Sequence, residues 1–364
     1  MNGRIRIALA GGGWRASFYA RVALALPERF ELTGSWLHDP NKRAAWYARY
    51  GGRMADSLED LLKEQPDYVV LCISKPAISA ALIRLMQLGV AVLCETPLAT
   101  QEHELFTIWR VAQETNACVQ VAEQYPLQPY YAAWKRVVDG GMIGPPSCMS
   151  ISAVHGYHAV SLIRQFLSVG YENAQICAKR YAFPVLETAG RGGVSIKKTI
   201  ECQRRDRVSL VFESGKAAFY DFSPVQYASL IRARHFCVQG PLGEIDDLSL
   251  RAVTERGQPM TIQLKRYDLG RYGNMELCLH ALTLGERCLY LNPFGHARLN
   301  DDELAVAEMM ERMGQLCRGE DVRVYPLAEA LQDTYISLEM ERAMNQSWQP
   351  VRTHAHCWVP IHHI

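Results

Sequence analysis

The sequence predicts an α/β fold, with a doubly wound parallel sheet in its N-terminal part and then an α+β domain with an open, largely antiparallel sheet. Over the first third of the chain, short apolar segments alternate with helical segments, which is typical of parallel strands covered by helices on both faces. From residue 174 onward, strand-like segments dominate. Two of them meet across Ser214-Gly215, which indicates a two-residue hairpin.

The elements of the first domain follow from apolar runs and helical periodicity. Strands are expected at residues 4–10, 30–36, 68–74, 91–94 and 118–122, with a short one near 53–55. Helices are expected between them, at residues 14–26, 42–50, 58–63, 77–88 and 101–115. The pattern changes after Ala122, so we place the domains at residues 1–123 and 124–364.

The second domain begins with a helix at residues 131–140 that ends at Gly140-Gly141, and Pro145-Pro146 separates it from the next strand. Strands are expected at residues 148–154, 174–181, 198–204, 208–213, 216–222, 235–238, 248–254 and 260–264, and helices at 301–316 and 327–343. The basic run at residues 204–207 is interpreted as a solvated hairpin turn.

Composition argues against nucleic-acid and membrane partners. The chain has 39 Lys+Arg against 38 Asp+Glu, a net charge of +1, which excludes the basic surface of a nucleic-acid binder. No segment approaches the roughly 18 apolar residues of a membrane span, and no separate leader precedes the first strand. The 11 cysteines form no Cys-x-x-Cys pair, so we expect reduced thiols in a cytoplasmic protein.

The first strand ends in a glycine turn, Gly11-Gly12-Gly13-Trp14-Arg15-Ala16, which fits Gly-x-Gly-x-x-Ala between a strand and a helix. Gly11 permits the tight turn, Gly13 lets a pyrophosphate approach the backbone, and Ala16 keeps the helix close to the sheet. The phosphate then lies on the helix N-terminus. The sequence therefore predicts a Rossmann domain that binds a dinucleotide, with Trp14 and Arg15 also at the site.

The residues after the second strand leave the choice between NAD and NADP open. The position that normally carries the ribose-binding acid is Leu37, with His38 and Asp39 following it. Asp39 is as well suited to cap the next helix as to bind ribose. Lys42 and Arg43 are candidates for a 2′-phosphate or for solvated surface residues.

With these residues assembled, the chain resembles the Gfo/Idh/MocA family of sugar and cyclitol oxidoreductases over nearly its whole length. The resemblance rests on the glycine turn and on four further segments: Pro66-Asp67 through Ser74 with Pro76, Gly89 through Ala99, Val121 through Tyr125 with Pro129, and Gly156-Tyr157-His158. It implies a cofactor site that also includes Ser74, Pro76, Glu95, Thr96, Pro97 and Gln124. It also places Tyr125, His155 and Ser161 against the substrate, at an inter-domain cleft.

Two departures from the family pattern concern the chemistry. The family's Glu-Lys-Pro is here Glu95-Thr96-Pro97, and its His-x-x-Asp is His158-x-x-Ser161. His158 is the predicted proton-transferring group, since imidazole titrates near neutral pH. Its ionisation must then be set by another group, such as Ser161, His155 or Tyr157.

Lys75 is the candidate replacement for the missing lysine. It follows the fourth strand if residues 53–55 count as the third, and Thr96 follows the neighbouring fifth strand. The carboxyl ends of both strands then face the ligand crevice. The alternative is that Lys75 is only a solvated loop residue.

The leading hypothesis is an NAD(P)-dependent oxidoreductase acting on a sugar-like or carbonyl-bearing small molecule, with His158, Lys75 and Tyr157 catalytic. Two alternatives stay open: a non-redox hydrolase or lyase with tightly bound NAD, and an inactive dinucleotide-binding regulatory protein. The resemblance also implies a homo-oligomer, a dimer or tetramer formed through the open sheet. No metal site is predicted, because His354, His356, His362 and His363 fit no closed structural site.

Overall fold

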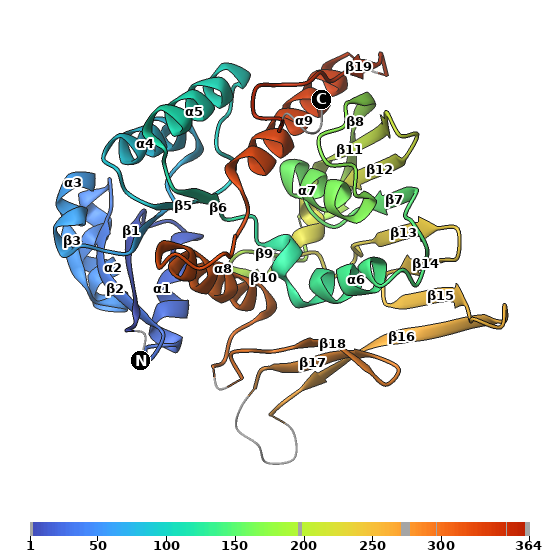
Figure 1. Cartoon of the computed structure of the whole chain (residues 1–364), viewed down its shortest axis with the longest axis horizontal. Helices are drawn as coiled ribbons and strands as arrows, with labels where there is room; N and C mark the ends of the chain where they lie inside the picture. Colours follow the sequence, from blue (N-terminus) through green and yellow to red (C-terminus); the bar gives the residue numbers. More distant parts are fainter. Residues whose placement is uncertain (1–2, 196–198, 271–276, 296, 347, 361–364) are drawn as a thin grey trace. The chain divides into compact units, whose positions relative to one another are not determined.

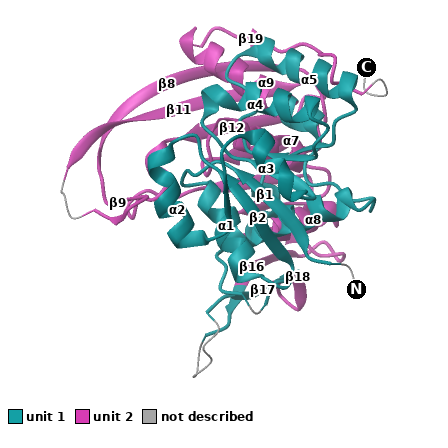
Figure 2. Cartoon of the chain, turned by 90° about the vertical axis from the view of Figure 1, so that its left-hand side faces the viewer, with its two compact units in different colours: residues 1–131, 266–281, 290–331 teal, residues 132–265, 282–289, 332–364 magenta. Residues whose placement is uncertain are grey.

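The computed structural model describes residues 3–195, 199–270, 277–295, 297–346 and 348–360. Contacts within the chain divide it into two compact units, coloured separately in Figure 2. Unit 1 comprises residues 1–131, 266–281 and 290–331, and unit 2 comprises residues 132–265, 282–289 and 332–364.

Unit 1 contains a six-stranded parallel sheet with the strand order β3-β2-β1-β4-β5-β6. Its strands are β1 (Ile5–Ala10), β2 (Phe30–Trp36), β3 (Arg53–Ala55), β4 (Tyr68–Leu71), β5 (Val92–Cys94) and β6 (Val119–Val121). The parallel sheet predicted from the alternating pattern is confirmed, including its short strand at residues 53–55. The strand order reverses between β1 and β4, so the carboxyl ends of these two strands open the crevice where such sheets bind ligands.

The helices of the βα units are α1 (Ala16–Ala25), α2 (Arg43–Tyr50), α3 (Leu58–Leu61), α4 (Lys75–Gln87) and α5 (Glu102–Thr115), shown in Figure 1. α5 starts at a capping box between Gln101 and Glu104, which satisfies backbone donors at its first turn. Every strand of β4 to β6 is buried along its length, which explains its near-continuous apolar sequence.

A later helix, α8 (Asp301–Cys317), completes unit 1. The Tyr68 hydroxyl donates to the backbone oxygen of Met310 at 2.8 Å, which ties α8 to β4. At Gly314, a Cβ would fall 2.4 Å from Ile5 of β1, so only glycine allows this close approach. The sequence division at 123/124 assigned this helix to the second domain, because nothing local marks its contact with a strand far away in the chain.

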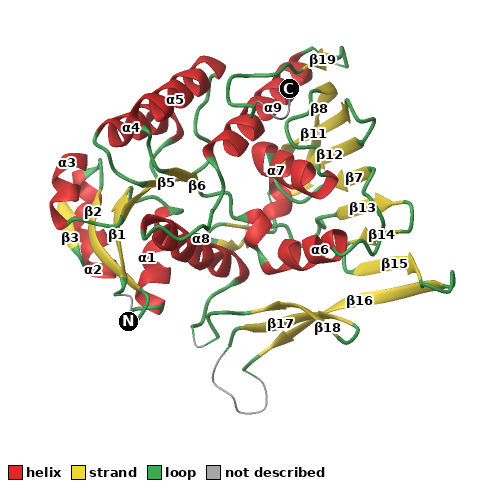
Figure 3. Cartoon of the chain, in the orientation of Figure 1, coloured by secondary structure: helices red, strands yellow, loops and turns green. Residues whose placement is uncertain are grey.

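Within the described residues, the strands of the second sheet, yellow in Figure 3, follow the order β18-β17-β16-β15-β14-β13-β7-β12-β11-β8-β19. A separate small sheet pairs β9 with β10. The strands are β7 (Cys148–Ile151), β8 (Ala174–Leu186), β9 (Ala189–Gly190), β10 (Gly193–Val194), β11 (Ile200–Phe212), β12 (Ala217–Phe222), β13 (Phe236–Gly240), β14 (Gly243–Asp246), β15 (Ser249–Val253), β16 (Pro259–Asp268), β17 (Leu279–Leu284), β18 (Arg287–Leu291) and β19 (Val351–Arg352). The pairing is mostly antiparallel, with β12 and β7 parallel. The predicted hairpin across Ser214-Gly215 is confirmed as the β11–β12 pair.

One face of this sheet is buried and the other is open. Along β12, Tyr220 and Phe222 are buried whereas Phe219 is 48% exposed, which is the alternation of a one-sided sheet. Helix α7 (Gly156–Leu167) covers the buried face, where the rings of Phe166 and Phe236 lie 4.9 Å apart. The remaining helices are α6 (Pro129–Asp139) and α9 (Leu327–Asn345). The predicted open sheet is therefore confirmed.

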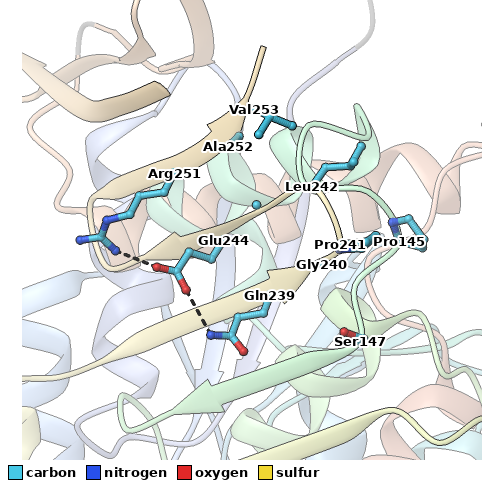
Figure 4. A pocket seen from close by; sticks show the side chains of 11 residues that line it. Pro145, Ser147, Gln239, Gly240, Pro241, Leu242, Glu244, Arg251, Ala252 and Val253 are labelled. Carbon is cyan, nitrogen blue, oxygen red and sulfur yellow. Dashed lines mark hydrogen bonds and ion pairs between the residues drawn. The ribbon is translucent and has the colours of Figure 1, made fainter. Parts of the chain in front are cut away.

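The open face carries a shallow hollow of about 790 Å³ over β13, β14 and β15 (Figure 4). Glu244 accepts hydrogen bonds from Arg251 at 2.9 Å and from Gln239 at 3.1 Å, and these three side chains form its polar part. Leu242 and Val253, about half exposed, form its apolar part.

The interpretation of residues 204–207 as a hairpin turn is wrong. They lie inside the single long strand β11, where two strands and a turn were expected. Asp206 is buried there and receives a hydrogen bond from Arg180 of β8 at 2.6 Å, so cross-strand pairing satisfies the charge that suggested a solvated turn. β14, β17 and β18 were not predicted, and residue 198 lies outside the described residues.

Candidate functional site

The glycine turn joins β1 to α1 at the carboxyl edge of the unit 1 sheet. Gly11 has φ +136°, and a Cβ on it would lie 1.8 Å from the backbone oxygen of Cys72. A Cβ on Gly12 would lie 2.3 Å from Leu37. Around Gly13, by contrast, no described atom outside its chain neighbours lies within 4 Å of a built Cβ. The turn is thus closed at Gly11 and Gly12 and open at Gly13.

The two large residues of the turn make contacts with other parts of unit 1. Trp14 is 50% exposed and its ring lies edge-on to Phe18 at 4.8 Å. Arg15 forms ion pairs with Glu95, directly after β5, and with Asp302 of α8. Ala16 is fully buried, as the predicted close packing of the helix on the sheet requires. The opening at Gly13 fits a pyrophosphate group against the start of α1.

Arg15 is the centre of a buried charge cluster. Its Nε donates to Glu95 Oε1 at 2.8 Å and its Nη1 donates to Asp302 Oδ2 at 2.7 Å. Tyr19, one turn along α1, donates its hydroxyl to the same Glu95 oxygen at 2.5 Å. Burial opposes the charge on Arg15, but Glu95 and Asp302 raise its pKa well above the ordinary value. The guanidinium is therefore a fixed cation.

Two residues predicted for the cofactor site each have a buried polar atom without a hydrogen-bond partner among the described residues: Arg15 Nη2 and Gln124 Oε1. A buried hydrogen-bond donor or acceptor without a partner lowers the stability of the folded state by about 1–3 kcal/mol. Such atoms therefore call for an explanation, and a bound ligand or water that supplies the missing hydrogen bond is one. Arg15 Nη2 is a cationic donor suited to an anionic oxygen, and Gln124 Oε1 is an acceptor suited to an amide. Both chemistries occur in a nicotinamide dinucleotide, so the residues present fit this group.

Glu123 adds an acid that the sequence analysis did not single out. It is 3% exposed, and its Oε1 accepts the Tyr125 backbone N–H at 3.3 Å. Burial raises the pKa of Glu123 well above its ordinary value, and Glu95 adds to the shift. Tyr19 and Asp302 were also missed. Tyr19 follows Arg15 at helical spacing, but Asp302 has no signal in the sequence because it is brought close only by α8.

The other residues predicted for the cofactor site lie at the same sheet edge but differ in their roles. Asp39 Oδ1 accepts the Asn41 N–H at 3.0 Å and caps a short 3₁₀ turn, so its capping role is realised. His38 is exposed beside Trp36. Ser74 precedes α4, and the side chains of Ser74, Lys75 and Pro76 are exposed.

The Glu95-Thr96-Pro97 segment follows β5, as predicted. Glu95 Oε2 accepts the Thr96 backbone N–H at 3.2 Å, which fixes the carboxylate over its own turn. Pro97 is buried and Thr96 is half-buried. Tyr125 is buried, with its ring 6.1 Å from that of Tyr131. The structure therefore brings Arg15 to the acid of this segment and leaves Lys75 in solvent.

In unit 2, the predicted catalytic histidine lies in an aromatic cluster at the start of α7. His158 is 6% exposed, and its ring centroid is 4.9 Å from that of His155 and 4.5 Å from that of Tyr157. His155 Nε2 lies 3.1 Å from the Tyr157 hydroxyl and Nδ1 lies 2.5 Å from the Tyr227 hydroxyl. Tyr227 was not predicted, because it belongs to a short turn after β12.

Ser161 does not take the place of the missing aspartate in the described hydrogen bonds. It is fully buried, and its oxygen accepts a hydrogen bond from Gln165 at 3.2 Å. The rings next to His158 are those of Tyr157 and His155. The Tyr227 hydroxyl contacts the His155 ring and also accepts the His155 backbone N–H at 3.0 Å. Two imidazoles and two phenols, all groups that can carry protons, are thus brought together at the start of α7.

Two of the C-terminal histidines pack against aromatic side chains. His354 Nδ1 lies 3.1 Å from the Tyr335 hydroxyl, and the His356 ring stacks on Trp358 at 4.4 Å. These contacts are those of packed aromatic residues. His362 and His363 lie outside the described residues.

Comparisons with known proteins agree with this geometry. Residues 5–123 match the family model described as an oxidoreductase family with an NAD-binding Rossmann fold, the Gfo/Idh/MocA family. A comparison with curated protein sequences finds no significant match. Within the described residues, no helix combines the length and apolar character of a membrane span.

Several solved structures share the fold over nearly the whole chain. An NAD-binding oxidoreductase from Klebsiella pneumoniae is 16% identical with a TM-score of 0.69, covering 97% of this chain and 100% of its own. An oxidoreductase from Agrobacterium radiobacter in complex with NAD+, L-tartaric acid and magnesium is 15% identical with a TM-score of 0.68, covering 96% and 98%. A UDP-N-acetylglucosamine 3-dehydrogenase from Acidithiobacillus ferrooxidans is 14% identical with a TM-score of 0.65, covering 95% and 99%.

These solved structures share the fold of this chain, including both of its large sheets. The family model matches the part of the chain that forms the parallel sheet. Residues 5–123, which contain the glycine turn open at Gly13 and the arginine bound to Glu95, match the NAD-binding Rossmann fold of the Gfo/Idh/MocA oxidoreductase family.

Proposed function

We propose that this protein is an NAD(P)-dependent oxidoreductase that interconverts a carbinol and a carbonyl group on a polyhydroxylated small molecule. The observation that carries the proposal is the opening at Gly13, placed between a parallel strand and a helix N-terminus in a Rossmann domain. When bound there, the nucleotide supplies the hydride acceptor or donor. The residues of the chain must bind it, orient it and move the hydroxyl proton.

We assign to His158 the transfer of the hydroxyl proton of the substrate. Oxidation of a carbinol releases a proton from its oxygen, and a base must accept it in the transition state. An imidazole suits this role at neutral pH. His158 is buried and adjoins His155, whose ring nitrogens both lie within hydrogen-bond reach of phenols, Tyr157 and Tyr227. We assign these three residues to orienting His158 and the substrate, together with Ser161 and Tyr125.

The family's Glu-Lys-Pro lysine supplies a positive charge that this chain lacks at Thr96. We propose that Arg15, and not Lys75, supplies it here. Arg15 is bonded to Glu95, the residue directly before Thr96, and its remaining Nη2 donor is buried and unpaired among the described residues. Lys75 is exposed at the start of α4, where its charge is screened by water. Lys75 stays a prediction as a second cation at the same sheet edge.

Binding is tested first, by thermal melting with NAD, NADH, NADP and NADPH in parallel. At least one nucleotide is expected to raise the melting temperature, since a ligand that binds only the folded state stabilises it. The nucleotide that does so is then used with a panel of sugars, sugar nucleotides, cyclitols and hydroxy acids. Sugar nucleotides and hydroxy acids are included because similar structures are a UDP-N-acetylglucosamine 3-dehydrogenase and a complex with L-tartaric acid.

His158→Asn tests the chemical step. Loss of an acid–base group is expected to lower turnover about 10²- to 10⁴-fold while nucleotide affinity stays unchanged. His235→Asn is the matched control, because His235 is an exposed histidine of the same unit paired with Asp247. Equal turnover in the wild type and His158→Asn would contradict the assignment.

The two alternatives are distinguished in the same experiments. Turnover without added nucleotide, from protein that copurifies with NAD, would replace the proposal by a hydrolase or lyase that uses NAD internally. Nucleotide binding without turnover on any substrate would favour a regulatory protein. No melting shift with any of the four nucleotides and no copurifying nucleotide would exclude all three.

We also propose that the protein is a cytoplasmic homo-oligomer that associates through the open sheet face. All 11 cysteines are free thiols, which suits a reducing compartment. Apolar side chains on that face, including Phe219, Leu242 and Val253, are about half exposed. Phe219→Asp is expected to shift the mass measured by light scattering from that of a dimer or tetramer towards that of a monomer.

A further inference from the structure

A second hollow in unit 1 lies at the edge of the sheet opposite the glycine turn. It has a volume of about 480 Å³ and is lined by residues just before β4, just before β5 and just before β6, together with the end of α8. Because all strands of this sheet are parallel, these are the amino ends of the strands, whereas Gly13 and Glu95 follow carboxyl ends. The nucleotide site does not use this hollow.

Two cysteines from distant parts of the sequence line the hollow: Cys118, directly before β6, and Cys317, the last residue of α8. The Cys118 side chain is exposed and that of Cys317 is partly buried. Both thiols thus face the same hollow, and the interaction between them shifts the pKa of each. The Cys118 thiol is the one accessible to small solutes.

The chemistry of the two thiols is unequal. The interaction with Cys317 lowers the pKa of Cys118 to about 7, which favours the thiolate form of Cys118. The same interaction, together with burial, raises the pKa of Cys317. Cys72 and Cys94 of the same sheet are buried, and burial raises the pKa of both thiols. Thiolate character and exposure together determine reactivity, so Cys118 is set apart from these neighbours.

We propose that Cys118 and Cys317 form a redox-active dithiol that a hydroperoxide converts reversibly to a disulfide. The Cys118 thiolate attacks one oxygen of hydrogen peroxide, the O–O bond breaks, and the departing hydroxide takes a proton to become water. Cys118 is then a sulfenic acid. The Cys317 sulfur attacks that sulfur, the S–O bond breaks, and the second oxygen leaves as water. The two thiols lose two electrons and two protons, and the peroxide is reduced to two waters.

The disulfide joins two elements that are held by noncovalent contacts alone in the reduced protein. It links the start of β6 to the end of α8, whose first turn carries Asp302, the partner of Arg15. Oxidation therefore fixes one end of the helix whose other end holds the charge cluster. The inference concerns the thiols themselves and does not depend on the proposed enzyme activity.

The test is oxidation of the full-length protein with one equivalent of hydrogen peroxide, followed by alkylation of remaining thiols, proteolysis and mass spectrometry. The expected product is a cross-linked pair of peptides containing Cys118 and Cys317, short of two hydrogen atoms and separated again by dithiothreitol. No cross-link of this pair after oxidation would overturn the proposal. So would oxidation of Cys118 at the same rate as Cys202, an exposed cysteine in unit 2.

Two variants sharpen the result. In Cys317→Ser, Cys118 is expected to stop at the sulfenic acid, which dimedone traps, whereas Cys202→Ser keeps the wild-type cross-link. Iodoacetamide alkylation of Cys118 in the wild type is expected to reach half its maximal rate near pH 7, and at a higher pH in Cys317→Ser. An unchanged pH profile in that variant would show that the two sulfurs do not interact.

Discussion

Replacing Gly13 by alanine separates the role of this residue in folding from its role in nucleotide binding. The backbone at Gly13 is outside the left-handed region, and a Cβ there meets no described atom within 4 Å apart from those of its chain neighbours. Alanine at such a position stabilises a protein by about 0.4–1 kcal/mol, because it reduces the freedom of the unfolded chain. The free energy of unfolding of Gly13→Ala is therefore expected to equal or exceed that of the wild type.

Binding is expected to change in the opposite direction. The added methyl group fills the space through which a diphosphate approaches the amides at the start of α1. A hydrogen bond to a charged group contributes about 1.5–3 kcal/mol. Its loss weakens nucleotide binding about 10- to 150-fold, since each 1.4 kcal/mol is a factor of ten.

The assay is a calorimetric or fluorescence titration with the nucleotide that stabilises the wild type, alongside thermal melting of each variant. Gly192→Ala is the matched control, because Gly192 also has open space around a built Cβ but lies in unit 2. It is expected to bind nucleotide as the wild type does. Wild-type affinity in Gly13→Ala would refute the reasoning, since the opening would then not be a phosphate site.

Three further perturbations test the structure. Gly11→Ala places a Cβ 1.8 Å from the Cys72 oxygen at φ +136°, so we expect a loss of at least about 3 kcal/mol from strain and overlap; a melting temperature equal to that of Gly13→Ala would disprove this. The raised pKa of Glu123, due first to burial, means that its contribution to stability is complete below the pKa of the unfolded chain and is lost as pH rises through the folded pKa. Glu123→Gln should therefore raise the melting temperature more at pH 8 than at pH 5, and the opposite order would contradict the sign. Arg164 Nη1 and Asp333 Oδ1 lie 2.6 Å apart in a pair that is 2% and 4% exposed, so Arg164→Met should destabilise by about 3–5 kcal/mol; urea unfolding measures this, and the double change with Asp333→Leu should recover part of the loss.

The parallel sheet was predictable because its strands are buried on both faces and its helices carry capping and glycine signals. The same local information placed residues 53–55 correctly as a strand. The prediction from local sequence was wrong at residues 204–207. A run of charged residues is found in solvated turns, but it is also found in strands whose neighbouring strand supplies the opposite charge. Arg180 supplies that counter-charge to Asp206, from a strand whose register no local pattern gives.

In the candidate site, too, the local features could be predicted and the contacts between distant residues could not. The glycine turn was predictable because the residues of Gly-x-Gly-x-x-Ala have the backbone conformations and small side chains that a bound phosphate requires. The partner of Arg15 was not, since Asp302 is separated from it by 287 positions. The replacement for the missing lysine was therefore sought at Lys75, which follows the right strand but lies in solvent.

The sequence by itself determined the parallel sheet, the glycine turn, the histidine at the start of α7 and the near-zero net charge. These follow from the periodicity, conformational freedom and ionisation of residues close together in the chain. Only the tertiary structure decided that Arg15 binds Glu95 and Asp302, that Tyr227 holds His155, and that Cys118 meets Cys317. Each of these contacts joins residues from separate elements, and packing of the elements against one another fixes the distances on which their charges and protons depend.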